Sequence, residues 1–147
     1  MDFPSQPPIK CEIPEEILRA FDIVPIACLK AEDYIVIFEN EDDIINASPK
    51  LSLLSELDLR GVAISSRSGK YDFVTRFFAP KYGINEDPVT GSSFTQLIPF
   101  WAKELDKKVL RAKQVSSRGG EVNCGFLGDR VTISGKSAKY MVGQIEI

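Results

Sequence analysis

Residues 91–105 predict a helix with apolar side chains on almost every side, and this segment limits the available folds more than any other. Apolar residues recur along it at helical spacing: Phe94, Leu97, Ile98, Phe100, Trp101 and Leu105. Because a helix without a polar face is stable only when it is buried, we expect the rest of the chain to enclose it. We also expect Pro99 to kink the helix, since proline has no backbone N–H to donate.

The segments on both sides of this helix have the patterns of short strands. Strands are predicted at residues 26–30, 34–39, 61–66, 71–78, 109–116, 121–127, 130–134 and 140–146. Short helices are predicted at residues 14–21 and 49–57, and a loop at residues 79–90. Strands and helices do not alternate regularly, so we predict an α+β fold. Its mixed, mostly antiparallel sheet is expected to roll into a barrel-like shape around one central buried helix, at about residues 91–105.

The chain has the length of one domain. It contains 147 residues, of which 44% are hydrophobic, and a chain of this size can bury a core without disulfides or metals. Residues 1–14 contain four prolines, which predicts an extended connector or edge segment. We therefore assign residues 15–147 to a single domain.

The composition excludes several classes of active site and partner. The chain has no histidine, which removes the usual general base near neutral pH and the commonest metal ligand. Its cysteines, Cys11, Cys28 and Cys124, are far apart in the sequence, so we expect structural thiols in a reducing compartment. The net charge is −3, and no apolar run is long enough to span a membrane. We expect a cytoplasmic protein that binds neither nucleic acid nor a membrane.

Two charged segments have both a functional and a structural interpretation. Residues 32–43 hold six acidic residues and no basic one, which could attract a cation but is more typical of a solvated face. The segment Arg118-Gly119-Gly120-Glu121 could cradle a phosphate, yet it lies between two predicted strands and lacks the spacing of a phosphate loop. We interpret it as a hairpin turn in which the arginine and the glutamate pair.

The loop before the apolar helix carries the strongest candidate site. The first turn of a helix leaves backbone N–H groups without acceptors and a partial positive charge, which suits a carboxylate. Gly91 would let a ligand approach the backbone, and Thr90 or Ser92 could cap the helix. Asp87 could accept a hydrogen bond from the same ligand. A capped helix after a proline turn would use the same residues, so the pattern also fits a purely structural role.

The second half of the chain resembles a known family in several motifs. The first is the string Asp72-Phe73-Val74-Thr75-Arg76-Phe77-Phe78-Ala79-Pro80. The most specific one is Glu86-Asp87-Pro88-Val89-Thr90-Gly91-Ser92. Further matches are Phe100-Trp101-Ala102, Gln114-Val115-Ser116, Arg118-Gly119-Gly120-Glu121 and Gly128-Asp129-Arg130-Val131. These motifs resemble the PhzF-like proteins of phenazine biosynthesis, which are relatives of diaminopimelate epimerase.

The resemblance implies half of a two-lobed fold. Family members have two similar lobes, each a rolled sheet around a central helix, and the active site lies between the two helix N-termini. The family's acid/base glutamate and a Gly-Asn-Pro type motif belong to the first lobe, and this chain contains neither. Residues 1–4 resemble the segment that leaves the first lobe. The chain is therefore expected to be the C-terminal lobe of a diaminopimelate epimerase-like fold.

The resemblance also implies roles for the residues of the loop. Asp87 is expected to be catalytic, and a substrate carboxylate is expected to bind at Thr90, Gly91, Ser92 and Ser93. The chain departs from the family at Phe94, where a histidine is common, so a polar group of the pocket is lost there. Glu86 could act as a second acid/base group, although neighbouring residues rarely point into one pocket.

The implied activity is an isomerase or epimerase reaction by proton transfer, without metal or cofactor, on a small carboxylate-bearing molecule. We expect the lobe to be incomplete alone and to be joined by the missing N-terminal lobe or by a second copy in a homodimer. The alternative is a non-catalytic, self-associating module that binds a small molecule or another protein.

Overall fold

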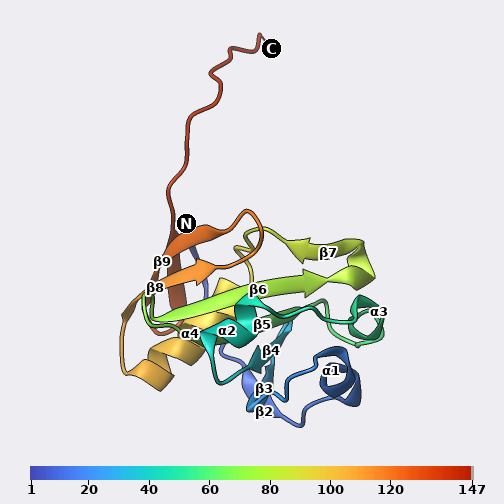
Figure 1. The fold of residues 1–147 in the computed structure, drawn as a ribbon. Coiled ribbons are helices and arrows are strands. Elements are labelled where there is room, and N and C mark those ends of the chain that lie inside the picture. The colour runs from blue at the N-terminus through green and yellow to red at the C-terminus, as the bar shows by residue number, and fades with distance from the viewer. Residues whose placement is uncertain (147) are drawn as a thin grey trace.

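The computed structural model describes residues 1–146, which form one ten-stranded sheet with helices on both faces (Figure 1). The strands are β1 (Asp2–Pro4), β2 (Ile9–Cys11), β3 (Ala27–Lys30), β4 (Tyr34–Ile37), β5 (Val62–Arg67), β6 (Phe73–Ala79), β7 (Ile84–Asp87), β8 (Val109–Gln114), β9 (Gly120–Phe126) and β10 (Arg130–Ser134). The helices are α1 (Glu15–Ala20), α2 (Glu41–Ile45), α3 (Leu51–Leu54), α4 (Phe94–Leu105) and the 3-10 turn η1 (Pro80–Tyr82).

The sheet is mixed and mainly antiparallel, as predicted, but it is open. Its order is β1-β10-β9-β8-β6-β5-β4-β3-β2, and β7 also pairs with β6. The pairs β4/β5 and β6/β8 are parallel. In residues 1–146 the edge strands β1 and β2 pair only with β10 and β3, respectively. The prediction of a closed, barrel-like sheet is therefore not confirmed, because the two edges do not meet.

Helix α4 packs on one face of the sheet. The residues Phe94 to Pro99, Trp101 and Ala102 are buried against strands from β3 to β10. The indole of Trp101 stacks on Phe73 with ring centroids 5.6 Å apart, and its Nε1–H donates to the Ser65 hydroxyl at 2.9 Å. The side chains of Lys103 and Glu104 are exposed. The helix is thus buried on most sides, but solvent reaches one side near its C-terminal end.

A second core lies on the opposite face of the sheet. There α1, α2 and α3 cover the strands, with Ile17, Ile44 and Leu54 buried under them. The middle strands are consequently buried on both faces, which explains why β4 reads Tyr-Ile-Val-Ile without a polar residue. The sheet, and not α4, is the central layer of the molecule (Figure 1). The predicted central position of the helix is not confirmed for this reason.

Pro99 is accommodated inside α4 by a contact from the N-terminal segment. Proline cannot donate to the carbonyl four residues earlier, which is that of Thr95. This carbonyl instead accepts the backbone N–H of Gln6 at 3.0 Å. The helix is assigned continuously from Phe94 to Leu105. Pro99 therefore leaves the Thr95 carbonyl available, and this carbonyl fixes the segment between β1 and β2.

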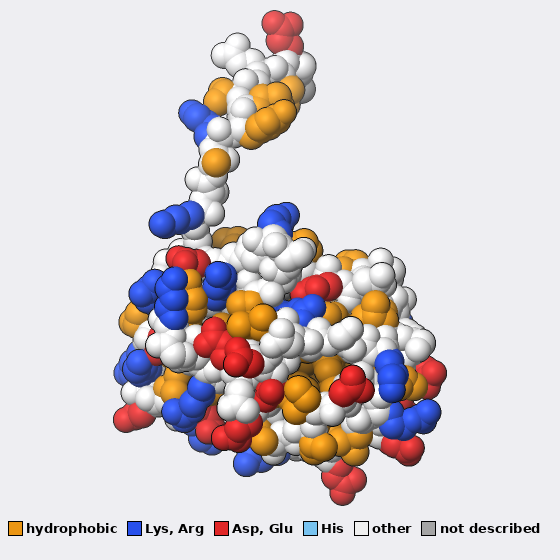
Figure 2. Space-filling model, viewed as in Figure 1, with side chains coloured by type: hydrophobic (Ala, Val, Ile, Leu, Met, Phe, Trp, Pro, Cys, Tyr) orange, Lys and Arg blue, Asp and Glu red, His pale blue; other side chains and the backbone are white. Residues whose placement is uncertain are grey.

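Two local predictions differ from the structure, and one short helix was not predicted. Residues 140–146, predicted as a strand, are exposed and unpaired, and they extend away from the body with apolar side chains gathered on them (Figure 2). Residues 84–87, predicted as loop, form β7 at the edge of β6. Residues 41–45 form α2, which begins with a capping box of Asn40 and Asp43. Among the described residues, no helix is long and apolar enough to cross a membrane.

Candidate functional site

The candidate site lies where two strands meet along one edge of β6. Strand β8 runs parallel to the first half of β6 and pairs Gln114 with Thr75. Strand β7 runs antiparallel to the second half and pairs Asp87 with Phe77. The carboxyl ends of both strands therefore converge on the middle of β6. Residues 88–93 leave the sheet where β7 and β8 end side by side on β6. Loops at the carboxyl ends of neighbouring strands often form binding sites.

A buried glutamine fixes the loop at residues 88–93. Gln114 is fully buried. Its Nε2–H donates to the Asp87 carbonyl at 2.6 Å, and its Oε1 accepts the backbone N–H of Thr90 at 2.8 Å. The Ser116 hydroxyl donates to the Pro88 carbonyl at 2.7 Å. The loop is thus held by side chains at the end of β8, so Asp87 and Thr90 have defined positions.

The hydroxyl groups near the helix start do not cap it. Thr90 donates its hydroxyl to Asp87 Oδ2 at 2.8 Å, and Ser93 donates to the Thr90 carbonyl at 3.0 Å. Ser92 accepts a hydrogen bond from Arg60 at 3.0 Å. Helix α4 begins at Phe94, later than predicted, and Ser93 makes no side-chain cap. The expectation that Thr90 or Ser92 caps the helix is wrong.

The turn before α4 presents backbone donors without protein acceptors. Within residues 1–146, no hydrogen bond uses the backbone N–H of Gly91, Ser92 or Ser93. The N–H of Phe94 donates back to the Gly91 carbonyl at 3.2 Å. A side chain at Gly91 would meet no atom within 4 Å, so the space beside the backbone is open. These donors add to the positive end of the α4 dipole.

A pocket of about 650 Å³ borders this turn. It is lined by Met1, Val89, Gly91, Phe94, Val122, Ile133, the turn 118–121 and residues 134–136. Arg118 and Lys136 bring positive charge to its lining and Glu121 brings negative charge, and Phe94 contributes an apolar wall. Of the predicted site residues, only Gly91 lines this pocket; Asp87, Thr90, Ser92 and Ser93 do not.

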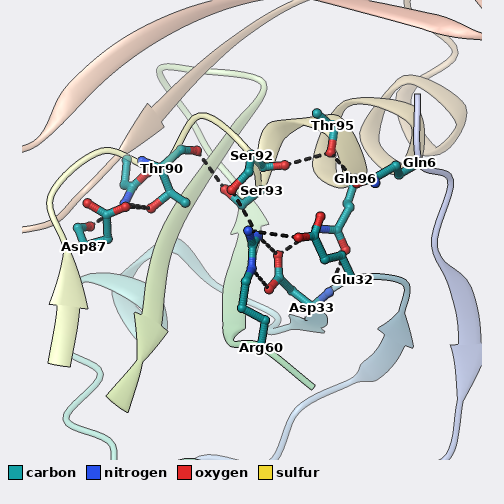
Figure 3. A network of polar contacts seen from close by, with 11 residues as sticks. Gln6, Glu32, Asp33, Arg60, Asp87, Thr90, Ser92, Ser93, Thr95 and Gln96 are labelled. Atoms are coloured by element: carbon teal, nitrogen blue, oxygen red, sulfur yellow. Dashed lines mark hydrogen bonds and ion pairs between the residues drawn. The ribbon is translucent and has the colours of Figure 1, made fainter. Parts of the chain in front are cut away.

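A buried ion pair holds the other side of the turn (Figure 3). The carboxylate of Asp33 is completely buried and accepts from Arg60 Nε at 2.9 Å and from Nη2 at 2.6 Å. Glu32 lies 3.0 Å from Arg60 Nη1. The hydrogen bond to Asp33 is the largest contribution that raises the pKa of Arg60 above its ordinary value. This pair was not predicted, because the six acidic residues at 32–43 have the pattern of a solvated face.

Two other acidic residues are already bound to protein groups. Glu86 forms a bidentate pair with Arg76, with distances of 2.7 and 2.9 Å, so it is not free to act beside Asp87. Glu121 accepts the Tyr71 hydroxyl at 2.6 Å, and this hydrogen bond is the largest cause that lowers the pKa of Glu121. The predicted pairing of Arg118 with Glu121 is wrong. Gly119, with a φ of 67°, instead forms the turn beside them.

Comparison with known proteins identifies the family. The model of the family described as phenazine biosynthesis-like protein matches residues 12–143. An uncharacterized isomerase of Pseudomonas aeruginosa is 44% identical over 147 residues, covering 100% of this chain and 57% of the relative. An uncharacterized isomerase of Halalkalibacterium halodurans is 34% identical over 149 residues, covering 99% of this chain and 56% of that protein.

Solved structures agree with this assignment. The crystal structure of a PhzF family protein from Enterococcus faecalis superimposes with a TM-score of 0.89 at 38% identity, covering 92% of this chain and 52% of that one. A structure from Clostridium difficile described as a putative phenazine biosynthesis PhzC/PhzF protein gives a TM-score of 0.88 at 36% identity, covering 100% and 57%. The chain therefore spans little more than half the length of these relatives, and it belongs to the phenazine biosynthesis-like family.

Proposed function

We propose that this member of the phenazine biosynthesis-like family provides the carboxylate-binding half of an isomerase. The proposed reaction is a proton transfer on a small carboxylate-bearing molecule, without a cofactor. The main support is the turn 91–93, where three backbone N–H groups lack protein acceptors next to a pocket of about 650 Å³. Two relatives that match along the whole chain are named as isomerases.

The chemistry needs a place for negative charge. When a base removes the proton from the carbon next to a carboxylate, the electron pair moves onto the carboxylate oxygens. Return of a proton to the carbon completes the isomerisation. Backbone N–H groups fixed at those oxygens stabilise the intermediate more than the substrate, because the charge on the oxygens grows. The turn 91–93 supplies such donors, and two basic residues, Arg118 and Lys136, line the same pocket together with one acidic residue, Glu121.

Asp87 is the proposed acid/base or orienting residue within this chain. Its side chain is half-buried, and Oδ2 accepts the Thr90 hydroxyl. No hydrogen bond within residues 1–146 uses Oδ1, which leaves one oxygen for an amino or hydroxyl group of a ligand. Proton transfer across a substrate needs a second group on its other side. We propose that this group is a glutamate of a second lobe, as the family resemblance implies.

The first experiment tests carboxylate binding by the chain itself. Acetate is titrated into isotope-labelled protein while the backbone amide signals are followed by NMR. We expect saturable shifts at Gly91, Ser92 and Ser93, and smaller shifts in the turn at Gly128. Equal shifts at the two turns, or none at residues 91–93, would contradict the proposed site.

The second experiment tests catalysis. The chain is joined to the part of the Pseudomonas aeruginosa relative that lies outside the match, and deuterium uptake from D₂O into small amino and hydroxy acids is followed by NMR. We expect exchange by the joined protein, little by the chain alone, and a loss of about 100-fold or more for Asp87→Asn. Asp129→Asn, a matched change in an exposed turn, should have no effect. Normal turnover by the unjoined chain would disprove the division of roles.

A non-catalytic module remains the second candidate function, supported by the exposed segment 136–146. Tyr140, Met141, Val142 and Ile145 are each at least 76% exposed. Apolar side chains on an extended segment favour association with another surface. Sedimentation at increasing concentration tests this alternative. Self-association of the chain, together with no deuterium exchange by the joined protein, would favour the module. A monomer at all concentrations would exclude self-association.

A further inference from the structure

We propose that Arg60, held by the buried carboxylate of Asp33, is a positioning residue that fixes Ser92 and thereby aims the backbone N–H groups of residues 91–93 at a bound carboxylate. The inference rests on the proposed carboxylate site. It adds a residue from outside the loop, on the segment between α3 and β5, to the groups on which that site depends (Figure 3).

Asp33 is bound on every side, so the pair is rigid. Its carboxylate accepts two N–H groups of Arg60 and the Nε2–H of Gln96, the last at 2.7 Å. Its backbone N–H donates to Oε1 of Gln96 at 3.0 Å. Gln96 is itself fully buried in the first turns of α4. The turn between β3 and β4 is therefore attached directly to the start of α4, and Arg60 is held between them.

The contacts of Arg60 exclude a direct role in holding a ligand carboxylate. Nε and Nη2 donate to Asp33, and Nη1 lies 3.0 Å from Glu32. Two carboxylates surround one guanidinium, so the local charge is negative and would repel an anion. The guanidinium also lies over the Phe77 ring, 5.7 Å from its centroid, and its contact with the turn before α4 is the donation from Nη2 to the Ser92 hydroxyl at 3.0 Å. The effect of Arg60 on the site is thus transmitted through Ser92.

The hydroxyl of Ser92 attaches the turn in addition to its carbonyl, which accepts the N–H and the hydroxyl of Thr95 at 3.1 and 2.7 Å. On one side of the turn, Thr90 is fixed by Gln114. Gly91 follows, and it has no side chain to contact its neighbours. Ser92 is exposed, and in the described residues Arg60 is the partner of its hydroxyl. With Gln114 on one side and Arg60 on the other, the three N–H groups are held in one orientation before a ligand arrives, which lowers the cost of ordering them on binding.

A double-mutant cycle tests the proposal. The variants are Arg60→Lys, Ser92→Ala and the combination of both. Hydrogen exchange is measured without ligand at the amides of Phe94 and Thr95, which donate to the carbonyls of Gly91 and Ser92, and acetate affinity is measured by the NMR titration. Lysine keeps the charge but lacks the planar fork that reaches Asp33 and Ser92 together. We expect each single variant to speed exchange at residues 94 and 95 at least fivefold and to weaken acetate binding by a similar factor.

The double variant should be no worse than Arg60→Lys alone, because that change already removes the contact with Ser92. Additive effects would show that Arg60 acts through general stability and would overturn the proposal. Arg130→Lys, which changes an exposed ion pair with Asp2, is the matched control and should leave both measurements unchanged. Ser92→Ala is a surface change that leaves the ion pair intact, so unchanged exchange in this variant alone would also refute the inference.

The two proposals can fail separately. If acetate shifts none of the amides at residues 91–93 in the unmodified chain, the carboxylate site is wrong. The exchange cycle is measured without ligand and still decides whether Arg60 orders the turn through Ser92. If acetate binds but the cycle is additive, the site stands and the positioning role of Arg60 is wrong.

Discussion

Gln114 holds Thr90 from two sides: its side-chain oxygen accepts the Thr90 backbone N–H at 2.8 Å, and its nitrogen donates to the Thr90 hydroxyl at 3.2 Å. Gln114 is the last residue of β8, and Thr90 lies three residues beyond the end of β7. This contact therefore links the two strands that converge on β6. It determines where the loop turns toward α4.

Replacing Gln114 with leucine should destabilise the protein by about 2 kcal/mol or more, because the Thr90 N–H and the Asp87 carbonyl would remain buried without a partner. Urea unfolding followed by tryptophan fluorescence measures the change. Gln144→Leu makes the same substitution at an exposed position and should change stability by less than about 0.5 kcal/mol. Equal effects of the two variants would contradict this role of Gln114.

The pair of Tyr71 and Glu121 should make stability depend on pH in the acid range. The pKa of Glu121 in the folded state lies below its ordinary value of 4.5, chiefly because of the Tyr71 hydroxyl. Such a group stabilises the fold above its unfolded pKa, and this contribution is lost as the pH falls through the folded pKa. Tyr71→Phe should therefore flatten the fall of unfolding free energy below about pH 4.5. Identical pH profiles for the two proteins would refute the assignment.

The buried thiols should react slowly in the folded protein. Burial is the main cause that raises the pKa of Cys28 and of Cys124, each to about 12. At pH 8 about one part in ten thousand of such a thiol is ionised, and the thiolate is the reactive form. Cys11 is half-buried and should be modified first by a thiol reagent. Mass spectrometry should find the label on Cys11, and labelling of all three should require denaturant.

Glycine at residue 61 should be necessary for packing. A Cβ built there would lie 2.6 Å from the ring of Phe77 and 2.8 Å from the Phe78 carbonyl oxygen. Because backbone cannot move away easily, Gly61→Ala should cost about 1–3 kcal/mol. At Gly69 a Cβ meets nothing within 4 Å, so Gly69→Ala should be neutral or slightly stabilising. Thermal unfolding of both variants checks the difference, and a neutral Gly61→Ala would contradict the packing shown.

The sequence predicted the elements whose signal is carried by their own side chains. The apolar spacing from Phe94 to Leu105 predicted α4, and the runs of branched and aromatic residues predicted β4, β5 and β6. Strand β7 was missed because its residues are Ile-Asn-Glu-Asp. It exists because the edge of β6 offers backbone partners, a property of the neighbouring strand. Residues 140–146 show the reverse case. They have the pattern of a strand, but no strand of the described residues pairs with them.

The candidate site was predicted in part for the same reason. The loop from Asp87 to Ser93 could be selected from its glycine, hydroxyl groups and carboxylate. Its supports could not, because Arg60 and Asp33 come from distant segments without a local signal, and Gln114 was recognised only as part of a family motif, without a role in the loop. The six acidic residues at 32–43 look alike in the sequence. Only the fold separates the buried Asp33 from the capping residue Asp43.

The edge of β6 that pairs with both β7 and β8 is completed in two steps during synthesis. As the chain leaves the ribosome, β5, β6 and β7 emerge before α4, and β8 emerges after it. Until β8 arrives, half of the β6 edge has no backbone partner and is open to other strands. The part of the sheet beside the candidate site is thus completed only after α4 has been synthesised.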